Sequence, residues 1–210
     1  MTTSIHEKEV VAAFDFDGTI TQHDTLLSFL MFTAGKWTAT KKLAYLSPQV
    51  IGFLLKLVSR QEVKEAVLEH FFKGMPSDQL LEMGTAFANS RELSQLIHPE
   101  AMMRLVWHQR QHHRCILVSA SIDTYLAPWC NKYGFNDLIC SKLQIDQYNH
   151  VTGLLDGLNC WGPEKERRLL KLLGPRENFI LYAYGDSCGD QELLSIADYP
   201  FYRKMPSSSF

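Results

Sequence analysis

The sequence predicts an α/β protein, with a doubly wound parallel sheet and a helical cap subdomain inserted after the first strand. Short apolar runs typical of buried strands alternate with helical patterns in the second half of the chain. A long, mostly helical region separates the first of these runs from the second, which indicates an insertion. The chain has 210 residues, enough for one core with an inserted subdomain. We therefore expect a core formed by 1–23 and 106–210, and a cap formed by 24–105.

The first strand ends in two carboxylates. The apolar run that begins at Val10 is followed by Asp15 and Asp17, and then by Gly18. A two-residue spacing on an extended chain places both carboxylates on one face. They repel each other unless a cation lies between them, and Mg²⁺ prefers such oxygen ligands. Glycine lets the chain turn sharply at this point.

The cap region reads as a series of helices. Gly35, Gly74-Met75-Pro76 and His98-Pro99 separate the helical patterns, and Pro48 is expected to break or kink the second of them. The predicted helices span 25–34, 37–58, 61–73, 77–89 and 99–113. Near the end of the last one, we expect His108, His112 and His113 to lie at the surface rather than to bind a metal.

The second half alternates between strands and helices. The predicted strands span 115–119, 138–146, 150–155, 179–184 and 198–202. The predicted helices span 121–133, 162–173 and 191–196. Such alternation implies parallel strands joined by right-handed crossovers.

Polar residues gather where the predicted strands end. Asp15, Asp17, Ser119 and Asp186 each follow an apolar run, so the parallel sheet brings them to one edge, where ligands bind in such folds. A hydroxyl such as that of Ser119 suits a phosphate oxygen. Lys165, near a helix start, adds a cation that would neutralise phosphate.

These motifs together resemble the haloacid dehalogenase-like (HAD) phosphatases. The resemblance rests on Asp15-Phe16-Asp17-Gly18-Thr19, Ser119, Lys165 and Gly185-Asp186-Ser187-Cys188-Gly189-Asp190, and it covers the whole chain in order. The helical insert is similar to that of subfamily IB, which includes phosphoserine phosphatases, phosphatidylglycerophosphatase C-like hydrolases and histidinol-phosphatase-like members. The resemblance implies a Rossmann-like core, a mobile helical cap and phosphomonoester hydrolysis.

The resemblance also implies roles for the site residues. Asp15 is expected to be the nucleophile that forms an aspartyl-phosphate, and Asp17 the general acid and then base. The Asp15 carboxylate, the Asp17 carbonyl and Asp186 are expected to bind Mg²⁺, with Asp190 supporting that site. Ser119 and Lys165 are expected to hold phosphoryl oxygens.

The substrate is less constrained. Asp24 occupies the place of an acidic residue that faces the substrate in phosphoserine phosphatases. Those enzymes also use a cap arginine to bind the serine carboxylate, but no Arg occurs between Gln61 and Ser90. Phosphoserine is therefore disfavoured, and a small phosphomonoester or a lipid phosphate is expected.

Charge and composition limit the partners. The net charge of −2 disfavours a nucleic-acid partner. The scattered cysteines and the polar stretch 1–9, without an apolar signal-peptide core, predict a cytoplasmic protein. Residues 36–60 carry a charge of +5 around an apolar middle. Two interpretations stay open: cap helices packed on each other with a rim of lysines, or peripheral contact with the anionic inner face of the membrane.

Two other functions use similar residues. A phospho-signalling receiver also combines carboxylates, a hydroxyl, a lysine and Mg²⁺, but its acidic groups come from different strands. A catalytically inactive HAD-like binding module is the second alternative. Retention of every catalytic residue type favours the phosphatase.

Overall fold

The computed structural model describes residues 8–46 and 55–206. Within these ranges, five parallel strands form the central sheet in the order β3-β2-β1-β6-β7, which confirms the predicted doubly wound α/β class. The strands of this sheet are β1 (Glu9–Phe14), β2 (Arg114–Ile122), β3 (Asp137–Ser141), β6 (Phe179–Gly185) and β7 (Tyr199–Tyr202). The strand order reverses between β1 and β6, and the carboxyl ends of these two neighbours therefore border the crevice where ligands bind.

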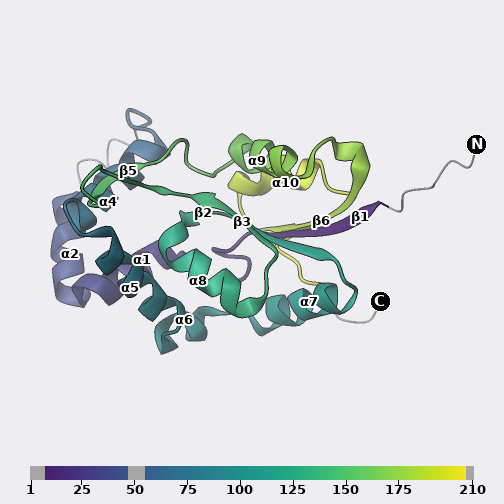
Figure 1. Cartoon of the computed structure of the whole chain (residues 1–210), viewed down its shortest axis with the longest axis horizontal. Helices are drawn as coiled ribbons and strands as arrows, with labels where there is room; N and C mark the ends of the chain where they lie inside the picture. Colours follow the sequence, from purple (N-terminus) through teal and green to yellow (C-terminus); the bar gives the residue numbers. More distant parts are fainter. Residues whose placement is uncertain (1–7, 47–54, 207–210) are drawn as a thin grey trace, which may run out of the picture.

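Helices cover both faces of the sheet, as Figure 1 shows. The helices beside the sheet are α7 (Pro99–Arg110), α8 (Asp123–Tyr133), α9 (Pro163–Leu173) and α10 (Gln191–Ser195). Alternation along β1 divides its side chains between two apolar clusters: Val11 and Ala13 lie with Leu169 of α9, and Ala12 and Phe14 lie with Leu105 of α7. Burial on both faces explains why β1 reads as a continuous apolar run.

The cap helices gather at one end of the sheet (Figure 1). They are α1 (Thr25–Ala34), α2 (Lys36–Tyr45), α4 (Arg60–Phe72), α5 (Ser77–Ala88) and α6 (Arg91–Leu96). Helix α6 is short and was not predicted. The Ser90 side chain accepts a hydrogen bond from the Leu93 amide and so caps the start of this helix. The predicted helix 37–58 is shorter than expected, because α2 ends at Tyr45 and residues 55–58 are not helical. The break predicted at Pro48 lies outside the described residues.

A β-hairpin from a later part of the sequence, after β3, packs against the cap helices. Its strands are β4 (Leu143–Ile145) and β5 (Val151–Leu155). The Gly74 amide donates to the Val151 carbonyl at 2.8 Å, and the Val151 amide donates to the Met75 carbonyl at 2.9 Å. Gly153 lies so close to α4 that a Cβ placed there would be 2.4 Å from the Glu69 Cα. The hairpin is therefore fastened to the cap by backbone contacts.

The prediction that His108 lies at the surface is wrong. Its side chain is fully buried, and its Nε2 lies 2.8 Å from the Tyr184 hydroxyl. Its Nδ1 lies 2.7 Å from Nδ1 of His113, and Arg104 donates to the same Tyr184 hydroxyl at 2.7 Å. Burial lowers the pKa of His108 to about 3 and keeps the ring neutral. A polar residue on the sheet-facing side of α7 is thus accommodated by a polar network inside an aromatic cluster.

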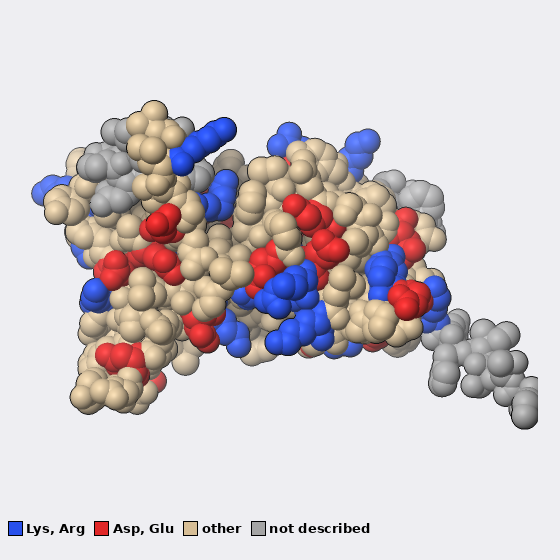
Figure 2. Space-filling view, turned by 90° about the horizontal axis from the view of Figure 1, so that it is seen from above, with Lys and Arg blue, Asp and Glu red and all other residues tan. Residues whose placement is uncertain are grey.

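Three further features concern the expected partners and location: the hydropathy of the helices, the state of the cysteines and the distribution of surface charge. In the described residues, no helix combines the length and apolar character that a bilayer crossing requires. All five cysteines are free thiols. On the face shown in Figure 2, acidic and basic side chains are interspersed rather than gathered into one basic patch.

The close approach at Gly153 yields the first prediction. Both Gly153 and Gly157 have positive φ, +88° and +90°, but only Gly153 has neighbours where a Cβ would lie. Each alanine variant loses stability from its backbone conformation. We expect Gly153→Ala to lower the free energy of unfolding by about 1–3 kcal/mol more than Gly157→Ala, measured by urea unfolding. Equal losses in the two variants would contradict the packing of the hairpin on α4.

Candidate active site

Three carboxylates converge where β1 and β6 end. Asp15 follows β1, and Asp186 and Asp190 belong to the turn that follows β6. One carboxylate oxygen from each of the three lies within 4.8 Å of the others. This cluster forms because β1 and β6 are paired in register as far as Phe14 and Tyr184. Of the residues predicted to converge at one sheet edge, Asp15 and Asp186 therefore lie together in this cluster.

Lys165 lies between two of these carboxylates. Its Nζ donates to Asp15 Oδ1 at 2.5 Å and to Asp190 Oδ1 at 2.6 Å, and its side chain is almost fully buried. Burial opposes the charged form of Lys165, but the two carboxylates outweigh it and hold its pKa above the ordinary value. Burial raises the pKa of Asp15 to about 7, and Lys165 limits that rise.

Asp190 organises the turn after β6. Its second oxygen accepts hydrogen bonds from the Ser187 amide at 3.0 Å, the Ser187 hydroxyl at 2.8 Å and the Asp186 amide at 3.3 Å. These bonds, with the one from Lys165, use both oxygens of a fully buried carboxylate. Asp190 thus positions its neighbours and is poorly placed to act as a free acid or base.

The Asp17 carboxylate is held by residues other than Lys165. Its Oδ1 accepts from the Thr25 amide at 2.7 Å and the Thr25 hydroxyl at 2.6 Å, and its Oδ2 accepts from the Ser121 hydroxyl at 2.5 Å. Burial raises the pKa of Asp17, as does the nearby carboxylate of Asp24, while the three hydrogen bonds lower it. A carboxyl group with a raised pKa in a fixed orientation is suited to proton transfer.

A cavity of about 520 Å³ lies over these groups, between core and cap. Its floor includes Asp15, Asp17, Lys165 and Asp186. Asp24 also lines it, although its Oδ1 accepts from the Leu26 and Leu27 amides and so caps α1. Ser119 does not line the cavity: it is fully buried, and its Oγ accepts the Ser121 amide at 3.0 Å.

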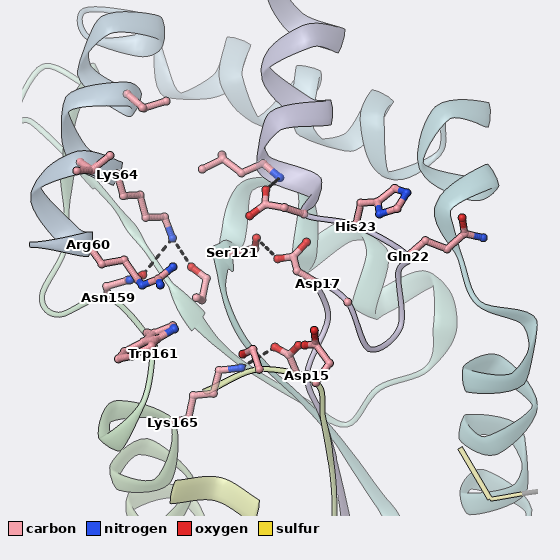
Figure 3. A pocket seen from close by; sticks show the side chains of 18 residues that line it. Asp15, Asp17, Gln22, His23, Arg60, Lys64, Ser121, Asn159, Trp161 and Lys165 are labelled. Atoms are coloured by element: carbon pink, nitrogen blue, oxygen red, sulfur yellow. Dashed lines mark hydrogen bonds and ion pairs between the residues drawn. The ribbon is translucent and has the colours of Figure 1, made fainter. Parts of the chain in front are cut away.

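Several lining residues were missed by the sequence reasoning. From the core they are Ser121, Asn159 and Trp161, and from the cap Arg60 and Lys64 (Figure 3). The alternation Ser119-Ala120-Ser121 offered a signal for Ser121, since side chains two apart in a strand share a face. No local pattern marks the others, because only folding brings α4 to the loop that precedes α9.

The carboxylate cluster fits a divalent cation. In the described part of the chain, Asp186 Oδ1 is a buried oxygen without a hydrogen-bond partner, and the Asp186 carboxylate belongs to the same cluster as Asp15. Gly18 (φ +82°) passes so near that a Cβ would be 2.3 Å from Asp186 Oδ2. Hard oxygen ligands, one of them unsatisfied, are the donor set that Mg²⁺ prefers.

Comparisons with known proteins point to one family. A model of the haloacid dehalogenase-like hydrolases matches residues 12–195. Protein CicA of Caulobacter vibrioides is 34% identical over 206 residues, which cover 97% of this chain and 90% of CicA. These matches confirm the family resemblance that the motifs predicted.

Solved structures share the fold. A protein of unknown function from Bordetella pertussis matches with a TM-score of 0.76 and 20% identity, over 90% of this chain and 87% of that one. A substrate-bound phosphoserine phosphatase complex matches with a TM-score of 0.59 and 15% identity, over 91% and 84%. At such low identities, the likeness concerns the fold alone.

The buried Lys165 makes stability depend on pH in a defined direction. In Lys165→Met, the pKa of Asp15 rises further above its unfolded value, so the folded state loses stability as pH rises. We expect a loss of about 3–5 kcal/mol at pH 8 and a smaller one at pH 5.5, measured by urea unfolding without metal. Lys171→Met, an exposed position on the same helix, is the control. The same loss at both pH values would refute this electrostatic role.

Proposed function

Because the chain belongs to the haloacid dehalogenase-like hydrolase family, we propose that it is a Mg²⁺-dependent phosphatase that hydrolyses phosphomonoesters through an aspartyl-phosphate. The observation that carries this proposal is the pairing of the Asp15 carboxylate with Lys165 beside Asp186, with Asp17 held separately in the same cavity. Phosphoryl transfer depends mainly on positioning and on neutralisation of charge, and this arrangement supplies both.

In the proposed reaction, an oxygen of Asp15 attacks phosphorus and the bond to the leaving oxygen breaks. Asp17 donates its proton to that oxygen, which its raised pKa favours. In the second step, Asp17 takes a proton from water, which attacks the phosphoryl group and releases Asp15. Lys165 and Ser119 hold phosphoryl oxygens. The Ser119 role requires its buried hydroxyl to reach the substrate.

The proposed metal ligands are the Asp15 carboxylate, the Asp17 main-chain carbonyl and Asp186. Asp190 supports them through the turn that it orders. When bound there, Mg²⁺ supplies positive charge to the phosphoryl oxygens and offsets the repulsion between carboxylates.

Two alternative functions were a phospho-signalling receiver and a catalytically inactive binding module. A receiver does not fit the family match, which spans both the first and the last motif. A catalytically inactive binding module has the same fold and the same residues, so only a measurement of turnover distinguishes it from a phosphatase.

We further propose that the substrate is a lipid phosphate, or that the protein contacts an anionic membrane. On α2, Trp37 is 85% exposed, and Lys36 and Lys41 are exposed beside it. Lys42 is engaged within the cap, where it donates to the His70 carbonyl at 3.0 Å. Much of the apolar middle predicted from the sequence, residues 47–54, lies outside the described residues.

The chemistry is tested by substitution. With p-nitrophenyl phosphate and Mg²⁺, we expect Asp15→Asn to lower kcat by at least about a thousandfold, because an amide is a poor nucleophile. Asp17→Asn removes the proton donor and should lower kcat by about 10²–10⁴-fold. Asp156→Asn, an exposed carboxylate elsewhere, is the control. Near-normal turnover by Asp15→Asn would remove Asp15 from the proposed role.

Metal dependence is tested on the unmodified protein. We expect EDTA to abolish hydrolysis and added Mg²⁺ to restore it, because the carboxylates otherwise repel the phosphoryl group. Activity that persists in EDTA, after metal analysis confirms that the protein is metal-free, would contradict the proposed site.

Membrane contact is tested by vesicle sedimentation. Each basic residue near an anionic surface contributes about 1 kcal/mol. We expect Lys36→Glu with Lys41→Glu to weaken binding to phosphatidylserine vesicles, and high salt to do the same. Lys132→Glu with Lys171→Glu changes the net charge equally on the core and is the control. Equal sedimentation with neutral and anionic vesicles would exclude this contact.

A further inference from the structure

We propose that the cap side of the cavity is a second-anion subsite built on Lys64, so that the preferred substrate is a phosphomonoester whose leaving group carries another anionic group. This inference rests on the proposed phosphatase function and specifies its substrate class. The cavity, at about 520 Å³, has room for a leaving group beyond the phosphate.

Lys64 enters the cavity from the cap. It lies on the second turn of α4 and points towards the strand end that carries Ser121, whereas Lys165 points to Asp15 (Figure 3). Its Nζ donates to the Ala120 carbonyl and, at 3.1 Å, to Asn159 Oδ1. An ammonium group has three N–H donors. The described contacts use two, so a third is left to meet a ligand.

The charge of Lys64 is not neutralised as that of Lys165 is. Lys165 forms salt bridges with two carboxylates, whereas Lys64 forms none with the described residues and has a carbonyl and an amide oxygen as its partners. Burial lowers the pKa of Lys64 to about 8, although the carboxylates of Asp17 and Asp24 favour its charged form. An anion delivered by the substrate would compensate this partly desolvated cation.

The surroundings of Lys64 strengthen such an interaction. Val63 and Val67, from the same helix, and Leu26 line the cavity beside it. Arg60 lies over the ring of Trp161, with its guanidinium carbon 4.8 Å from the ring centroid, and adds positive charge on the same side. Apolar walls lower the local dielectric constant and so increase the attraction between an anion and Lys64.

A purely structural role predicts a different result. Lys64 also joins α4 to the core through Ala120 and Asn159, so a purely structural loss would lower activity for every substrate alike. A subsite affects only those substrates that carry the second anion, and matched pairs separate the two roles.

The experiment compares kcat/KM for two pairs of phosphomonoesters. The first is 3-phosphoglycerate against glycerol 3-phosphate, and the second is 4-carboxyphenyl phosphate against phenyl phosphate. We expect the unmodified protein to prefer the carboxylate member of at least one pair by about tenfold or more, the effect typical of a hydrogen bond to a charged group. Lys64→Met should remove this preference and Lys64→Arg should retain it. Lys73→Met, at the far end of α4 and outside the cavity, should leave it intact.

Two results would overturn the subsite: no preference in either pair, or an equal loss for both members of a pair in Lys64→Met. Failure to hydrolyse any of the four compounds would instead overturn the proposed function. Calorimetric binding of 3-phosphoglycerate and glycerol 3-phosphate to Asp15→Asn tests the subsite without turnover. There, a preference that depends on Lys64 supports the subsite, and equal affinities contradict it.

Discussion

The ammonium group of Lys165, buried between Asp15 and Asp190, is the interaction on which the site depends. Three carboxylates could not be held at the ends of two adjacent strands without compensating positive charge. Lys165 comes from α9, on one face of the sheet, and reaches the sheet edge where β1 and β6 end. It joins the first and last motifs of the chain into one unit, because Asp190 in turn fixes the loop that carries Asp186.

The rest of the cavity is arranged around this fixed floor. Asp17 is turned away from Lys165 by Thr25 and Ser121, so that two carboxylates only two residues apart in the sequence have different environments. One is paired with a cation, and the other is held by hydroxyl and amide donors. Such a division between neighbouring carboxylates is what the proposed roles require, with Asp15 as the nucleophile and Asp17 as the proton donor.

The sheet and its carboxylates were predictable because their signals are local. A strand buried on both faces reads as a continuous apolar run, and parallel topology then brings Asp15 and Asp186 to one edge. Lys64 reaches the cavity only through contacts between distant segments, so no periodicity marks it. His108 was misplaced for a related reason: its position near the end of a predicted helix suggested the surface, but it joins a polar network with Arg104 and Tyr184 within the core. Ser119, which does end an apolar run, lies deeper than the pattern implied.

The contact between the hairpin and the cap helices limits how chimeras of related proteins can be built. The cap surface is assembled from two stretches far apart in the sequence: the helices after β1, and β4 with β5 after β3. The backbone bonds between Val151 and the Gly74-Met75 turn, and the contact of Gly153 with α4, join these stretches without help from matched side-chain charges. A chimera that transplants the helical segment alone would therefore leave its hairpin partner behind. The smallest transferable cap module is therefore discontinuous, and both of its pieces must come from the same donor.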